Sequence, residues 1–144
     1  TLIKKNKETK RKKILNNEVS KKILPILRKV VSSKEGTASL ANVDGYEIGG
    51  KTGTAQKIIE GSYSNKKINS FISVFPSFKP KFVLAVMLDE PKTNSEYIYH
   101  LRDGSNIRYK GTPFNTAGWT AVEVVGQIIE KIGPILATKY RDVN

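Results

Sequence analysis

Three runs rich in β-branched and aromatic residues follow one another in the middle of the chain and limit what it can fold into. They cover residues 47–59, 68–75 and 82–88, and the turns between them, 61–67 and 76–80, contain Gly, Ser, Asn and Pro. Connections this short leave no room for a crossover helix, so we expect antiparallel strands. The third run is apolar on both faces and predicts a central buried strand, whereas the glycines of the first indicate a strand that another group approaches closely.

Helical patterns flank these strands. After the N-capping residues Asn16 and Asn17, apolar residues recur at helical spacing until Gly36, and the interior Pro25 predicts a kink or two shorter helices. A second helix is expected over 118–132, before Gly133-Pro134, with one apolar stripe made of Val122, Val125, Ile129 and Ile132. The fold class is therefore α+β, an antiparallel sheet with flanking helices.

The 144 residues are expected to form a portion of one domain. We divide them into a basic lead-in and helix (1–34), the strand region (35–90), a long polar loop (91–116) and the C-terminal helix (117–137). The chain begins with Thr rather than Met, which suggests a piece of a longer protein.

Positive charge is concentrated near the N-terminus. The net charge is +12, and residues 1–34 carry twelve basic residues against two acidic ones. Such a segment can attract nucleic acid or anionic lipid, so a basic binding module is one alternative function. Lys outnumbers Arg 20 to 5, which favours a solvated basic arm over Arg-based readout of nucleic acid. The absence of cysteine excludes thiol catalysis, disulfides and thiolate metal sites.

A phosphate-binding pattern is a second alternative. Residues 45–52 read Gly, four residues, Gly-Lys-Thr, from Gly45 to Thr52. In a nucleotide hydrolase this loop follows a buried strand and opens a helix, so that backbone N–H groups converge on phosphate. Neither flank matches, because a polar stretch precedes the motif and Gly53 falls in the first turn of the expected helix.

The same residues can instead lie on a strand. Side chains alternate along a strand, so Thr52 and Thr54 project from one face and offer two hydroxyls to one carboxylate, while Gly53 leaves the edge open. Lys51 adds a positive charge for an anionic group or a proton network, and the Thr54 amide can help to stabilise an oxyanion.

Lys51-Thr52-Gly53 is a signature of penicillin-binding proteins and serine β-lactamases. Together with NSFISVFPSFKPKFVLAVMLDEP and TAGWTAVEVVGQIIEKIGPIL, it makes residues 14–137 resemble the C-terminal half of a class B penicillin-binding transpeptidase domain, in particular that of the division-specific peptidoglycan transpeptidases. The resemblance departs at the last helix, where Gly118-Trp119 and Ala121-Val122-Glu123-Val124 replace the more usual Gly-Gly and Ala-Ala-Pro-Val.

The resemblance implies a serine-type D,D-transpeptidase that crosslinks D-Ala-D-Ala stem peptides and binds β-lactams. It assigns Lys51 to the electrostatic and proton network, Thr52 and Thr54 to the terminal carboxylate, Gly53 to substrate approach, and the Thr54 amide to the oxyanion hole. It also implies no cofactor, divisome membrane proteins as partners, no nucleic acid, and a place at the periplasmic face of the inner membrane.

The nucleophile expected from the family is missing from these residues. No Ser-x-Asn occurs, and the only Ser-x-x-Lys, from Ser64 to Lys67, falls in a predicted turn, so we interpret it as chance. We therefore expect the chain alone to be inactive. We also expect it to self-associate, because an isolated sheet exposes apolar surface.

Three other candidates for functional residues are better explained by structural roles. His100 has no acidic or thiol cluster beside it in the sequence, so we expect a surface residue and no metal site. Asp89 and Glu90 are adjacent acids at a strand end that usually face solvent, and Trp119 opens an amphipathic helix, where packing is the expected role.

Overall fold

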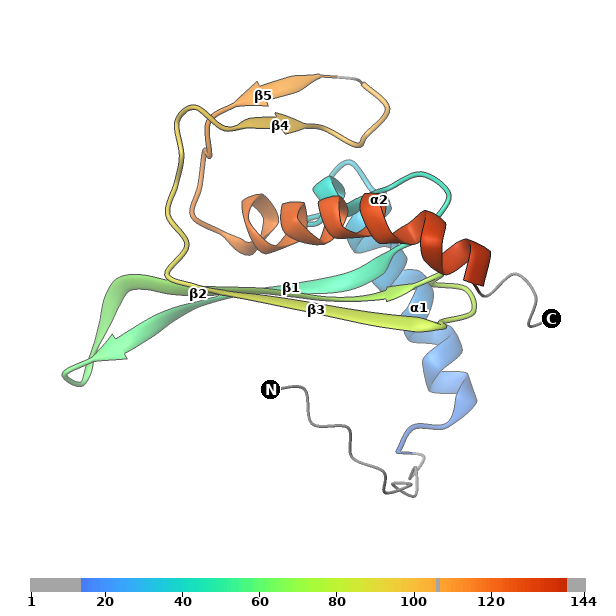
Figure 1. Cartoon of the computed structure of the whole chain (residues 1–144). Coiled ribbons are helices and arrows are strands. Elements are labelled where there is room, and N and C mark those ends of the chain that lie inside the picture. The colour runs from blue at the N-terminus through green and yellow to red at the C-terminus, as the bar shows by residue number, and fades with distance from the viewer. Residues whose placement is uncertain (1–13, 106, 140–144) are drawn as a thin grey trace.

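The computed structural model describes residues 14–105 and 107–139 and shows a sheet with one long helix along a face (Figure 1). The elements are, in order, α1 (Asn17–Ser32), η1 (Ser39–Ala41), β1 (Gly49–Ile59), β2 (Ser62–Phe75), β3 (Phe82–Asp89), β4 (Ile98–His100), β5 (Arg108–Lys110), η2 (Ala117–Trp119) and α2 (Ala121–Lys139). The α+β prediction is confirmed.

Helix α1 begins where the sequence predicts. Asn16 is the N-cap, and its side chain accepts a hydrogen bond of 2.9 Å from the Val19 amide. Of the two alternatives predicted at Pro25, a kink or two shorter helices, the second is wrong, because one helix of 16 residues runs through Pro25. Pro25 removes the hydrogen bond to the Lys21 carbonyl, but both residues are exposed, so water can satisfy that carbonyl.

The three long strands form an antiparallel sheet in the order β1-β2-β3. The predicted turn over 61–67 is wrong, because β2 already starts at Ser62 and the turn is the pair Glu60-Gly61. Both residues have positive φ, 50° and 78°, which is the backbone of a tight type I′ hairpin turn. The two long strands therefore continue together to the hairpin tip.

Strand β3 lies at an edge of the sheet, so the prediction of a central buried strand is wrong. Its side chains alternate between partly buried and exposed, and Val83 and Met87 are 71% and 72% exposed. Phe82, Leu84, Val86 and Leu88 pack against the core from the other face. An apolar run shows that both faces carry apolar groups, but it does not show that both are covered.

The predicted loop 91–116 contains a short hairpin made of β4 and β5, which lies on the side of α2 away from the sheet (Figure 1). Tyr99, 3% exposed, attaches it to the core, because its hydroxyl donates to the Trp119 carbonyl at 2.8 Å. A fully irregular loop is therefore wrong for this segment.

Helix α2 covers the inner face of the sheet (Figure 1). Val122, Val125 and Ile129 are fully buried, as the apolar stripe predicts. The expected end at Ile132 is wrong, because the helix continues to Lys139. A Cβ on Gly133 would lie 2.3 Å from the Tyr46 ring, so this glycine serves close packing rather than termination. No helix among the described residues is long and apolar enough to cross a membrane.

Candidate functional site

The segment Lys51–Thr54 lies within β1. Among the described residues, no strand pairs with the edge of β1 that faces away from β2. Thr52 is paired with Phe71 and Thr54 with Asn69, both of which are fully buried. Directly paired residues share a face of the sheet, so the two threonines project from the face that carries the core. The predicted side-by-side arrangement of the two hydroxyls on one face is present.

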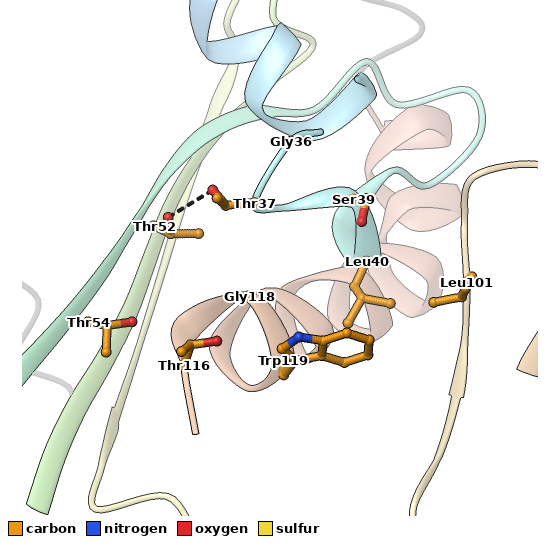
Figure 2. A pocket seen from close by; sticks show the side chains of 10 residues that line it. All are labelled: Gly36, Thr37, Ser39, Leu40, Thr52, Thr54, Leu101, Thr116, Gly118 and Trp119. Atoms are coloured by element: carbon orange, nitrogen blue, oxygen red, sulfur yellow. Dashed lines mark hydrogen bonds between the residues drawn. The ribbon is translucent and has the colours of Figure 1, made fainter. Parts of the chain in front are cut away.

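A cavity of about 410 Å³ opens beside these threonines (Figure 2). Thr52 and Thr54 line one side of it, and the opposite side is formed by Leu40, Leu101 and Trp119. The remaining lining residues are Gly36, Thr37, Ser39, Thr116 and Gly118. None of the lining residues is charged, so the cavity offers hydroxyl groups and apolar surface.

Both strand hydroxyls have partners from distant parts of the chain. The Thr52 and Thr37 hydroxyl oxygens lie 3.1 Å apart, and the Ala117 amide donates to the Thr54 hydroxyl at 2.9 Å. Because the Thr54 oxygen accepts this bond, its own hydrogen is free to be donated into the cavity. Sequence reasoning missed Thr37 and Ala117, since neither belongs to a motif.

Lys51 lies on the opposite face of β1 and is exposed. Its ammonium donates to the Thr52 carbonyl at 2.8 Å and does not line the cavity. The structure therefore brings Thr52 and Thr54 together and leaves Lys51 at the open edge. At Gly53, a Cβ would lie 2.7 Å from the Ser70 hydroxyl, so a larger residue would crowd β2.

The phosphate-loop alternative is wrong, because residues 49–59 form an antiparallel strand and no helix follows the motif. Ser64 is likewise no nucleophile at a helix start. It lies in β2, and its hydroxyl donates to the Lys57 carbonyl at 3.0 Å.

The sequence predicted that Asp89 and Glu90 face solvent, but both carboxylates have a partner in the structure. Lys57 binds both carboxylates, at 2.6 Å and 2.8 Å, from a register irregularity in β1. The hydrogen bonds to Asp89 and Glu90 raise the pKa of Lys57, and the Lys57 bond lowers the pKa of Glu90. This cluster joins β1 to β3 and is not part of the cavity.

His100 is exposed on β4, as expected. Within residues 14–105 and 107–139, no group of His, Cys, Asp or Glu could hold a metal ion. Trp119 packs against Tyr99 and Tyr109, with ring centroids 5.0 Å and 5.3 Å apart, but it also lines the cavity, which the sequence did not indicate.

The apolar side of the cavity is held in place by Arg102, which sequence reasoning also missed. Its side chain is 11% exposed and donates to the Leu40 carbonyl, to Glu123 at 2.9 Å, and through two nitrogens to Glu130. Burial alone would lower the pKa of Arg102, but the hydrogen bonds to Glu130 and Glu123 outweigh it and raise that pKa. The hydrogen bonds from Arg102 also lower the pKa of Glu130. Arg102 thereby joins η1, the β4–β5 hairpin and α2.

Comparisons with known proteins agree on one family. Residues 1–103 match the family described as penicillin binding protein transpeptidase domain. The chain is 36% identical over 140 residues to stage V sporulation protein D of Bacillus subtilis, covering 96% of this chain and 18% of that protein. It is 31% identical over 138 residues to the probable peptidoglycan D,D-transpeptidase FtsI of Caulobacter vibrioides, covering 90% of this chain and 21% of that protein.

A solved structure supports the same assignment. The apo structure of the TP domain from Burkholderia pseudomallei penicillin-binding protein 3 is 29% identical, with a TM-score of 0.60, over 81% of this chain and 29% of that chain. The chain thus spans about a fifth of the length of the two curated relatives. These relatives give no support to a nucleotide hydrolase or a nucleic-acid-binding module.

Proposed function

The chain belongs to the penicillin-binding protein transpeptidase family, and from this membership we propose that it forms the Lys-Thr-Gly wall of a peptidoglycan D,D-transpeptidase active site. The observation that carries the proposal is the pair of hydroxyls of Thr52 and Thr54, which share one face of an edge strand and line one cavity. The reaction is inferred from the family membership, and the role in substrate binding is inferred from the two threonine hydroxyls.

The proposed reaction of the complete enzyme is acyl transfer. A serine outside these 144 residues attacks the carbonyl of the D-Ala-D-Ala bond, the terminal D-Ala leaves, and an amine from a neighbouring stem peptide resolves the acyl-enzyme. A β-lactam acylates the same serine. The chain alone is therefore inactive in this proposal.

Thr52 and Thr54 bind the terminal carboxylate of the substrate. A carboxylate accepts hydrogen bonds and donates none, and the Thr54 hydroxyl has its hydrogen free because its oxygen already accepts the Ala117 amide. The free edge of β1 supports the oxyanion role of the Thr54 amide, since half of the backbone amides of an edge strand point away from its neighbour.

Lys51 contributes positive charge at the open edge of the strand. Its ammonium already donates to the Thr52 carbonyl and is exposed, so it can reach a group that approaches β1 from the free edge. A proton network with the nucleophile's own partners is the role we assign to it.

The setting of the reaction follows from the same membership. We propose the periplasmic face of the inner membrane as the location, and peptidoglycan stem peptides, β-lactams and divisome membrane proteins as partners of the complete enzyme. For the isolated chain we propose self-association through the outer face of the sheet, where Ile72, Val83 and Met87 are 56%, 71% and 72% exposed.

A chimera tests the function. Residues 1–144 replace the matching segment of the Caulobacter vibrioides relative, and acylation by a fluorescent penicillin is followed on a gel. We expect the chimera to be labelled, and Lys51→Ala to slow labelling by about 100-fold or more, the effect of losing a group that takes part in proton transfer. Lys79→Ala, which removes an exposed lysine of the β2–β3 turn, is the matched control and should label like the parent chimera.

Two results would contradict the proposal. One is a chimera that has the circular dichroism and melting behaviour of the relative but takes up no label. The other is full labelling of the Lys51→Ala variant together with full labelling when Thr52 and Thr54 are both changed to Val.

A further inference from the structure

Hydroxyl groups are concentrated around the cavity beside β1. Thr37, Ser39, Thr52, Thr54 and Thr116 all line it, and no charged side chain does. Only Thr52 and Thr54 belong to the Lys-Thr-Gly segment. The other three come from the loop after α1, from η1 and from the residues before η2, so the cavity has more hydroxyls than the motif supplies (Figure 2).

Thr37 is the hydroxyl residue in direct contact with the motif. Its oxygen lies 3.1 Å from that of Thr52, and either atom can donate (Figure 2). One hydrogen is used between the two groups, so the pair keeps one hydrogen for a further acceptor. Which residue supplies that hydrogen depends on the acceptor's position, and both can turn toward a ligand in the cavity.

The backbone on both sides of Thr37 is held tightly. A Cβ on Gly118 would lie 2.7 Å from the Thr37 carbonyl oxygen, and a Cβ on Gly36 would lie 2.3 Å from the Val30 carbonyl oxygen. The Ala38 amide donates to that same Val30 carbonyl at 3.1 Å, and Ala38 is fully buried. The backbone position of Thr37, and with it the point from which its side chain projects, is therefore set before any ligand arrives.

The fold has little need of this hydroxyl. Thr37 is exposed, and a hydrogen bond between two neutral groups at the surface contributes little to stability. A fixed backbone that presents an exposed hydroxyl to a cavity is the arrangement of a binding group rather than of a packing group.

We propose that Thr37 is a third hydroxyl of the carboxylate-binding set and contacts the carboxylate together with Thr52 and Thr54. This inference rests on the proposed function, which places the substrate carboxylate at Thr52 and Thr54. A carboxylate has about four lone-pair sites, so it can accept from all three hydroxyls when it takes the place of the Thr37–Thr52 hydrogen bond. Before binding, that hydrogen bond holds the two hydroxyls side by side at the cavity.

The test uses the full 144-residue chain and two probes, N-acetyl-D-alanyl-D-alanine and its C-terminal amide. Binding is followed by NMR titration, and Trp119, the only tryptophan of the chain, gives a single indole N–H signal at the same cavity. Thr37→Val keeps the side-chain shape and removes the hydroxyl. Thr37→Ser keeps the hydroxyl, and Thr93→Val removes an exposed threonine that does not line the cavity.

We expect Thr37→Val to weaken binding of the acid by about three- to tenfold, the effect of one hydrogen bond, and to leave binding of the amide unchanged. Thr37→Ser and Thr93→Val should stay within about twofold of the parent chain for both probes. A melting curve of each variant checks that the fold is retained.

Three results would overturn the inference. If the parent chain prefers the acid and Thr37→Val binds both probes as the parent does, Thr37 has no role while the proposed function stands. If Thr37→Val weakens both probes equally, it acts on the cavity wall and not on the carboxylate. If the parent chain does not prefer the acid, the carboxylate role of the whole wall is wrong, whereas the acylation of the chimera tests the enzymatic function separately.

Discussion

Replacement of Arg102 by Met is expected to destabilise the chain strongly. The guanidinium is 11% exposed and binds three groups from two separate segments: the Leu40 carbonyl and the carboxylates of Glu123 and Glu130. The Glu123 side chain is only 7% exposed. Met keeps an unbranched apolar stem about as long as that of Arg, so the substitution removes the guanidinium, with its charge and hydrogen bonds, and leaves the stem in place.

The magnitude follows from the burial of Glu123. Without Arg102, the Glu123 carboxylate keeps, among the described residues, only the Tyr97 hydroxyl at 3.0 Å and the Gln127 amide at 3.0 Å as donors. Removing one partner of a buried ion pair costs about 3–5 kcal/mol, which is a large part of the ~5–15 kcal/mol that stabilise a typical domain. Glu130→Gln should cost about 1 kcal/mol or less, because the Glu130 side chain is 48% exposed.

Urea unfolding of the full chain, followed by circular dichroism at pH 7, measures these differences. Arg108→Met, an exposed arginine on β5, is the matched control and should stay within about 0.5 kcal/mol of the parent chain. A loss below about 1 kcal/mol for Arg102→Met, with an unchanged slope in urea, would refute the reasoning that this guanidinium holds η1, the hairpin and α2 together.

The dependence of stability on pH below neutrality gives a second test. The hydrogen bonds from Arg102 lower the pKa of Glu130 in the folded chain. The stability that this pair contributes is therefore present above the unfolded pKa of about 4.3 and is lost as pH falls through the lower folded value. In Arg102→Met that pH dependence should be smaller.

Three further predictions concern other parts of the chain. Mass spectrometry of the isolated chain after incubation with penicillin should show no covalent adduct. A penicilloyl mass shift would disprove the proposal that the acylated serine lies outside these 144 residues. Val83→Lys combined with Met87→Lys should lower the apparent mass in light scattering, because both residues are exposed on the outer face of β3; an unchanged mass would exclude that face as the contact. Burial, followed by the Glu123 charge, raises the pKa of Tyr97 to about 12, so its contribution to stability is present below about pH 10 and is lost as pH rises toward 12. Tyr97→Phe should reduce the alkaline dependence in melting curves between pH 9 and 12 and leave the part that belongs to Tyr99, whose pKa is also raised by burial; an unaltered dependence would show that Tyr97 contributes nothing to it.

Most of the helices and long strands could be predicted from local patterns. The Asn16 cap and the apolar stripe of α2 are visible within a few residues of sequence, because capping and helical periodicity act over one or two turns. The errors came where local rules compete with packing. Gly133-Pro134 would end an isolated helix, but Tyr46 packs against that glycine and the helix continues.

The site was predictable in part for the same reason. The alternation of a strand places Thr52 and Thr54 on one face, and no other part of the chain is needed to see it. Lys51 was correctly placed on the strand, but the sequence did not show that its ammonium lies outside the cavity. Thr37, Ala117 and Arg102 carried no local signal, because each acts on a residue that is far away in the chain.

The sequence alone determined the order of the two helices and the three long strands, the antiparallel connections and the shared face of the two threonines, since backbone geometry encodes these within a few residues. Only the tertiary structure decided that β1 and β3 lie at the edges of the sheet. It also decided that Thr37, 15 residues before Thr52, and Ala117, 63 residues after Thr54, meet the two hydroxyls. Such contacts depend on how α2 and η1 pack over the sheet as a whole, and a pattern of neighbouring residues does not carry that information.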